Sequence, residues 1–190
     1  MAVRNVIITS LFTALIIVGS FIIIPVTVVP VTLQTLFVLL AGVLAGRKTA
    51  LTSTSLYLVL GAVGLPVFSG ASGGLAHYFG PTGGFLIGML LMAAISGAAG
   101  DAAMKYQNED QTLMKKGLVI LILGSFAATV SIYLVGIPFI KFNLDLTWPK
   151  AFATAMIPFI PGDLLKLVVV IIVSNIFFPR VRSYLAVKDE

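Results

Sequence analysis

The sequence predicts an all-α integral membrane protein, a bundle of six transmembrane helices that forms a single domain over residues 1–190. Two observations carry this prediction. First, 59% of the 190 residues are hydrophobic and only 10% are charged, whereas about 25% of the residues of a soluble domain are charged. Second, six segments approach the roughly 20 apolar residues that one membrane-spanning helix needs. The chain also lacks cysteine, which excludes disulfides and thiolate metal sites.

The six expected helices are bounded by the ends of these apolar runs. They span residues 5–24, 31–46, 49–63, 81–104, 113–139 and 162–178, and a short helix over 149–156 precedes the last one. The first run continues to Pro25 without a small-residue cleavage site, so we expect a retained span rather than a signal peptide. The second and third runs are short for a membrane crossing, which favours tilted helices or a sunken loop beside them.

The basic residues predict the orientation. If the N-terminus is cytoplasmic, Lys141 and Lys150 lie in outer loops, Lys166 lies at a membrane segment, and the other nine basic residues lie on the cytoplasmic side. These nine are Arg4, Arg47, Lys48, Lys105, Lys115, Lys116, Arg180, Arg182 and Lys188. Such an excess is typical of cytoplasmic loops, so both termini are expected in the cytoplasm. The net charge of +5 then reflects orientation, and nucleic acid is not an expected partner.

The connection between the third and fourth helices differs from a solvated linker. Its sequence, GAVGLPVFSGASGGLAHYFGPTGG (61–84), contains eight glycines and two prolines and no Lys, Arg, Asp or Glu. Irregular backbone of this kind is stable at membrane depth only where protein buries it, so the loop should fold over the outer face or dip into the bundle. It either covers a ligand or forms a tight structural plug.

Asp163 and Lys166 stand at the start of the last apolar run, in PGDLLK. Positions i and i+3 share one helix face. A charge at the bilayer centre costs about 2.5–3.5 kcal/mol on insertion scales, so both side chains should face the bundle or a wet cavity. Asp163 as a helix cap and Lys166 as a snorkelling anchor are the alternatives. We expect the pair to line a pocket for a small, partly apolar molecule, such as an acid that carries an amide or urea group.

Other polar residues give weaker signals. Gln34 and Thr32, at the outer start of the second helix, either join helices or contact a ligand. His77 has no second His or Cys beside it and is a poor metal site, so we expect it to be a hydrogen-bond donor in the loop. Ser10 and Ala14 form a small-xxx-small pair, which allows another helix to approach closely.

Several catalytic motifs are missing from the sequence. GRKT (46–49) lacks the upstream glycine of a P-loop, and neither HExxH nor GxSxG occurs. We therefore expect no enzyme activity, no cofactor and no metal, and the chain shows no energy source of its own.

Three stretches are informative in combination: PVTLQTLFVLLAGVLAG (30–46), LYLVLGAVGLPVFSGASGGLAHYFGPTGGFLIG (56–88) and IPFIPGDLLK (157–166). Together they resemble the BioY family, the biotin-specific substrate-binding (S) subunits of energy-coupling factor (ECF) vitamin transporters. The resemblance covers about a third of the chain. It implies that Asp163 and Lys166 line a biotin pocket, which the loop between the third and fourth helices closes. Ser72, before a double glycine, would contact the ligand ring at a position where some relatives have Asn.

The resemblance also implies partners. Ser10 and Ala14 would form the docking face for a transmembrane coupling protein, where two alanines are more typical, and two cytosolic ATPase subunits would supply energy. The expected location is then the prokaryotic cytoplasmic membrane, and the expected function is high-affinity biotin binding and uptake. The main alternative is a solitary carrier of biotin or a small acid, which works without ATPase partners. An intramembrane enzyme that uses Asp163 and His77, and a bundle without a ligand, are further alternatives.

Overall fold

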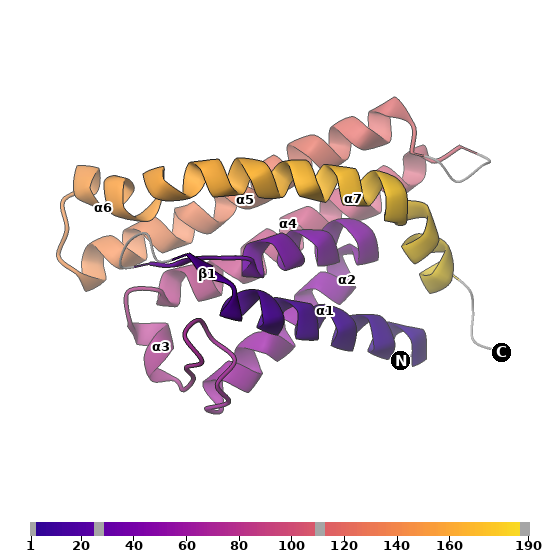
Figure 1. The fold of residues 1–190 in the computed structure, drawn as a ribbon. Helices are drawn as coiled ribbons and strands as arrows, with labels where there is room; N and C mark the ends of the chain where they lie inside the picture. Colours follow the sequence, from indigo (N-terminus) through magenta and orange to yellow (C-terminus); the bar gives the residue numbers. More distant parts are fainter. Residues whose placement is uncertain (1–2, 25–28, 109–112, 187–190) are drawn as a thin grey trace.

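The computed structural model describes residues 3–24, 29–108 and 113–186, and Figure 1 shows them as a bundle of long helices. Pro25 and Lys188 lie outside the described residues. The helices are α1 (Val3–Phe21), α2 (Gln34–Ala62), α3 (Ala76–Phe79), α4 (Gly83–Ala103), α5 (Lys115–Asn143), α6 (Trp148–Ala155) and α7 (Ile160–Ala186). Two 3₁₀ turns, Met104–Tyr106 and Ile157–Phe159, adjoin α4 and α7, and two short antiparallel strands, β1 (Ile23–Ile24) and β2 (Val31–Thr32), follow α1.

The surface of the bundle is suited to lipid. Five helical stretches of the described chain are long and apolar enough to cross a membrane: α1, α2, α4 with its 3₁₀ turn, α5, and α6 joined to α7. Large apolar side chains on their outer faces remain uncovered, among them Leu123 on α5 and Leu165 on α7. A soluble protein would bury or avoid such faces. The chain is therefore a multi-pass membrane protein.

Helix α2 consists of two halves that fold back on each other. Gln34 donates a hydrogen bond from Nε2 to the hydroxyl of Tyr57, 23 residues later. In one straight helix these residues would be about 34 Å apart. The reversal occurs at Gly46, whose φ of 88° and ψ of 173° are not helical, and Figure 1 shows the two halves running in different directions. Residues 34–45 and 47–62 thus correspond to the second and third expected helices.

Small residues allow α4 to lie against both halves of α2. A Cβ atom at Gly42 would overlap Ser96, and one at Gly97 would overlap the backbone of Arg47. Membrane helices without side-chain bulk at a contact gain close backbone packing, which replaces the hydrophobic effect as the driving force. This packing sets the distance between α2 and α4, both of which contribute residues to the pocket described below.

Several expected helix boundaries are wrong. The second helix begins at Gln34 and not at residue 31, because Val31 and Thr32 form strand β2, and the fifth ends at Asn143 and not at residue 139. The first helix ends at Phe21, because Ile23 and Ile24 pair as a strand with Thr32 and Val31 and only extend the apolar run. The last helix runs to Ala186 and not to residue 178, because hydropathy marks the membrane limit and not the end of the helix. Its final turns carry Arg182, which is held by Asp101 of α4 through a 2.8 Å ion pair.

Candidate functional site: a pocket at the end remote from the termini

A pocket of about 300 Å³ lies at the end of the bundle opposite the two ends of the described chain. This volume is at the lower limit of typical small-molecule sites. The wall is built from the β2 region and the start of α2, from the loop that follows α2, from α4 and α5, and from the start of α7. Its residues are Val29, Pro30, Thr32, Gln34, Thr35, Phe68, Ser69, Ser72, His77, Thr82, Phe85, Leu86, Met89, Met92, Ile132, Tyr133, Phe159, Asp163 and Lys166.

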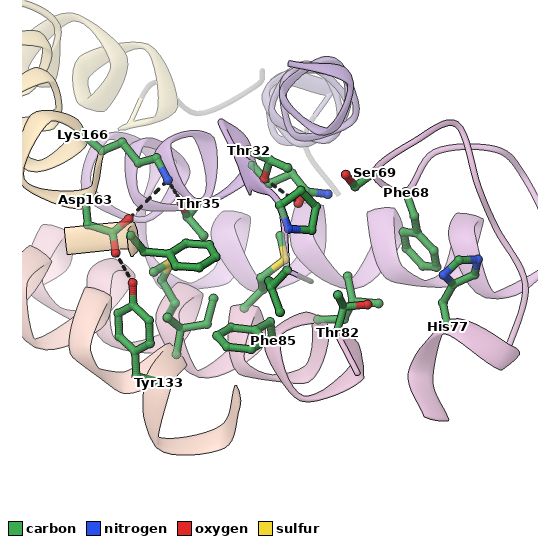
Figure 2. Close-up of a pocket in the computed structure, with 18 of the residues that line it drawn as sticks. Thr32, Thr35, Phe68, Ser69, His77, Thr82, Phe85, Tyr133, Asp163 and Lys166 are labelled. Atoms are coloured by element: carbon green, nitrogen blue, oxygen red, sulfur yellow. Dashed lines mark hydrogen bonds and ion pairs between the residues drawn. The ribbon is translucent and has the colours of Figure 1, made fainter. Parts of the chain in front are cut away.

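Asp163 and Lys166 form an ion pair at one end of this pocket (Figure 2). Lys166 Nζ lies 3.2 Å from Asp163 Oδ1, and the lysine is only 6% exposed. The interpretation of Lys166 as a snorkelling anchor is therefore wrong. Asp163 lies inside the first turn of α7, which begins at Ile160, and its carboxylate is directed to side chains of the pocket. It is not the residue that caps the helix.

Neighbouring helices hold both members of the pair. Tyr133 on α5 donates a hydrogen bond to Asp163 Oδ2, and Lys166 Nζ donates to Thr35 Oγ1 of α2 at 2.9 Å. The carboxylate thus accepts one hydrogen bond at each oxygen within the described structure. Removing one partner of such a buried pair costs about 3–5 kcal/mol, because the other charge is left uncompensated. The pair therefore fixes the relative positions of α2, α5 and α7 at the pocket.

Gln34 joins two helical segments, which is one of the two roles that its sequence position suggested, and its contact with a ligand stays a prediction. It lines the pocket, and it joins the two halves of α2 through Tyr57. Thr32 donates from Oγ1 to Gln34 Oε1 at 2.8 Å, which orients the amide. The amide group is consequently held in one position at the wall, with both of its polar atoms engaged by protein.

The loop between α2 and α4 forms the opposite end of the pocket, where Figure 2 shows Phe68, Ser69 and His77. Phe68 and Ser72 exchange two backbone hydrogen bonds, of 2.9 and 3.3 Å, across a tight turn. The Phe68 ring is 3% exposed and packs edge-to-face against His77, with ring centroids 5.7 Å apart. His77 is therefore part of an aromatic cluster at the wall.

Hydrogen bonds from several elements anchor this loop to the bundle. Ser20 on α1 donates to the carbonyl oxygen of Val67 at 2.7 Å, and the Tyr78 hydroxyl donates to that of Leu58 at 2.8 Å. Burial raises the pKa of the Tyr78 phenol, so it remains a neutral donor. Gly61 allows the loop to lie close, because a Cβ there would overlap the Phe68 ring. The loop is thus packed onto the bundle and is not a solvated linker.

With this geometry established, similarity to known proteins is informative. Residues 1–183 match the BioY family. The chain belongs to this family.

Curated BioY relatives cover nearly the whole chain. The "probable biotin transporter BioY" of Pyrococcus horikoshii is 36% identical over 179 residues, which is 92% of this chain and 96% of the relative. The "biotin transporter BioY" of Thermotoga maritima is 35% identical over 172 residues, with coverage of 90% and 94%. A 2.1 Å crystal structure of "the S-component for biotin from an ECF-type ABC transporter" superimposes with a TM-score of 0.76 and 27% sequence identity. The superimposed region covers 95% of this chain and 92% of the crystallised S-component.

All four pocket residues predicted from the sequence of this BioY family member line one cavity: Gln34, Ser72, Asp163 and Lys166. Ser72 donates from Oγ to the carbonyl oxygen of Ser69 at 2.8 Å. Their contact with a ligand stays a prediction. Sequence reasoning missed Tyr133 and Thr35, for which the only signals were a single phenol in an apolar helix and a hydroxyl beside Gln34.

Ser10 and Ala14 lie elsewhere. Both are exposed on the outer face of α1, and neither lines the pocket. Thr13, between them in the sequence, is buried and donates to the carbonyl oxygens of Thr9 and Ser53. The helix therefore packs inward on its Thr13 side and presents its small-residue pair outward.

Proposed function

We propose that the chain is the substrate-binding subunit for biotin of an ATP-driven ECF transporter in a prokaryotic cytoplasmic membrane. It acts as one domain with six membrane crossings and cytoplasmic termini, and the pocket faces outward. The reversal of α2 at Gly46 supports six crossings, since it turns one of five long helices into two antiparallel segments. The nine basic residues at the cytoplasmic ends support the orientation.

The observation that carries the proposal is the buried Asp163–Lys166 pair inside an otherwise largely apolar pocket. Biotin combines a cyclic urea, an apolar thioether ring and a carboxylate on an apolar chain. The urea is neutral and offers N–H groups to Asp163 and a carbonyl oxygen to Lys166. A carboxylate at the same place would add a second negative charge beside Asp163. The urea ring therefore lies against the pair and the carboxylate away from it, while Ser72 and Gln34 contact the ligand and the loop between α2 and α4 covers it.

A calorimetric titration of the purified chain tests this function. Biotin should bind with high affinity, and biotin methyl ester, which blocks the carboxyl group, should lose less affinity than an analogue whose urea ring is opened to the diamine. The opened ring loses the carbonyl acceptor and gains positive charge beside Lys166. Absence of biotin binding would refute the function. A greater loss for the methyl ester would reverse the proposed orientation.

The energy source is external in this proposal. The chain contains no P-loop, so two cytosolic ATPase subunits act through a transmembrane coupling protein that docks on the outer face of α1. The alternative, a solitary carrier, makes the opposite prediction for vesicles that contain only this chain.

If the coupling protein docks on α1, substitutions on that face should lower biotin uptake without changing biotin affinity. Ser10→Leu and Ala14→Leu place bulk on the exposed face of α1, so biotin affinity should remain within twofold while uptake into vesicles with the complete complex falls severalfold. Ala127→Leu, an equal change at an exposed position of α5, is the matched control. Vesicles that contain the chain alone should not accumulate biotin. Normal complex assembly and uptake by both α1 variants would eliminate this docking face, and ATP-independent accumulation would favour the solitary carrier.

A further inference from the structure

A second cavity, of about 250 Å³, lies at the opposite end of the bundle from the biotin pocket. It is enclosed by the start of α1, the first turns of the second half of α2, and the ends of α4 and α7. Its polar lining comprises Asn5, Thr9, Lys48, Thr49, Thr52 and Arg182. Two cations and four neutral polar side chains thus face one space, and the lining contains no Asp or Glu.

Most of this polar lining lacks partners within the protein. Thr52 donates to the carbonyl oxygens of Lys48 and Thr49 in its own helix. Among the described residues, the side chains of Asn5, Thr9, Lys48 and Thr49 form no hydrogen bond or ion pair. Thr49 is only 7% exposed. Thr49 is the buried member of this set, whereas Asn5 and Thr9 are half-buried and Lys48 is exposed, so their polar groups are available to a ligand or to water that enters the cavity.

Arg182 supplies a fixed positive charge to the cavity wall. It is 8% exposed, Nη1 lies 2.8 Å from Asp101 Oδ1, and Nη2 donates to the carbonyl oxygen of Val43 at 3.3 Å. Asp101 balances the charge of Arg182 and also accepts from the backbone N–H of Arg47 at 3.1 Å, so the net positive charge at the cavity comes from Lys48. Lys48 remains exposed and adds a second, mobile cation at the mouth. The cavity is therefore rich in donors and positive.

We propose that this cavity binds a phosphate anion at the membrane surface. Phosphate oxygens accept from ammonium, hydroxyl and amide donors, which are the groups that the lining offers. Basic pockets between membrane helices on the cytoplasmic side are suited to anionic lipid head groups, and Arg47 and Lys105 lie at the same end. The phosphate belongs either to an anionic phospholipid or to free phosphate. Bound there, it joins α1, α2 and α7.

The test is native mass spectrometry of the full chain, delipidated in neutral detergent and titrated with phosphatidylglycerol, phosphatidylcholine or inorganic phosphate. Phosphatidylglycerol should bind at least about fivefold more tightly than phosphatidylcholine, and Lys48→Gln should weaken it about fivefold, as expected for one basic residue at a lipid surface. Lys105→Gln removes the same charge at the same end but outside the cavity, so its effect should stay within twofold. Thr49→Val, which removes one neutral donor, should cost about threefold.

Inorganic phosphate identifies the source of the anion. If millimolar phosphate displaces the lipid, the site takes free phosphate, and if it does not, the site takes a lipid head group; both results support an anion site. Biotin affinity should be unchanged in Lys48→Gln, which verifies the fold, and Thr49→Val carries the test if that variant fails to fold. Equal binding of the two lipids together with no binding of inorganic phosphate, or equal effects of Lys48→Gln and Lys105→Gln, would overturn the proposal.

Discussion

Lys166→Met is expected to lower biotin affinity by about 10- to 100-fold in a calorimetric titration of the purified chain. The change removes a charged hydrogen-bond donor, which is worth about 1.5–3 kcal/mol. It also leaves Asp163 with Tyr133 as its remaining donor among the described residues. Asp163→Asn should cause a loss of at least about tenfold, because a neutral amide holds Lys166 and a urea N–H less strongly than a carboxylate does.

The controls for this prediction are equal changes outside the pocket. Lys150→Met and Asp145→Asn alter exposed residues of the connection that contains α6 and should leave affinity within twofold. The double variant Asp163→Asn with Lys166→Met removes both charges. It should recover much of the thermal stability lost in the single variants, because no buried charge is left unpaired, while biotin binding stays weak. If both single variants bind biotin as tightly as the native chain, the site assignment is wrong.

Gly46→Ala is expected to destabilise the fold by about 3 kcal/mol or more. An L residue at a φ of 88° is strained by about 1–3 kcal/mol. In addition, the new Cβ would overlap Asp101 Oδ1 and lie 2.7 Å from Arg182 Nη1, two groups that are held in an ion pair. The variant must therefore distort the turn between the two halves of α2 or displace the side chains of that pair. The loss is measured as the decrease in the free energy of unfolding in detergent, which a thermal or denaturant titration gives.

Gly64→Ala separates the two causes. Gly64 has a φ of 99°, yet a Cβ there would meet nothing within 4 Å. Its substitution therefore reports the backbone cost alone, about 1–3 kcal/mol. The excess of Gly46→Ala over Gly64→Ala then measures the crowding at the Asp101–Arg182 pair. An equal cost at both positions would show that the turn is not constrained by that pair.

Much of the arrangement follows from features that are local in the sequence. The apolar runs predict a membrane bundle, Arg47 and Lys48 interrupt one run where α2 reverses, and the spacing of Asp163 and Lys166 places both on one face of a helix. The composition of the loop after α2 indicates that it packs against the bundle. Each of these signals depends on one continuous stretch of the sequence.

Contacts between distant helices could not be predicted in this way. Thr35 meets Lys166 across 131 residues, and Tyr133 meets Asp163 across 30. Hydropathy reports which segments enter a membrane but not which of them become neighbours, since lipid and protein surroundings are both apolar. Hydropathy also does not separate a short apolar strand from a helix, so β1 (Ile23–Ile24) was expected to continue the first helix. The family resemblance, and not the spacing of the residues, supplied biotin as the ligand.

The internal partners of Asp163 and Lys166 also bear on repeated cycles of loading and emptying. Before any ligand arrives, the opposite charges neutralise each other, and Thr35 and Tyr133 occupy further hydrogen-bonding positions on them. If a ligand binds at this pair as proposed, its departure leaves no isolated charge in the pocket. The hydrogen bonds that a ligand makes with Asp163 and Lys166 would replace bonds that these side chains already make with Tyr133, Thr35 and each other. The proposed ligand affinity therefore depends on the difference in free energy between the two sets of bonds.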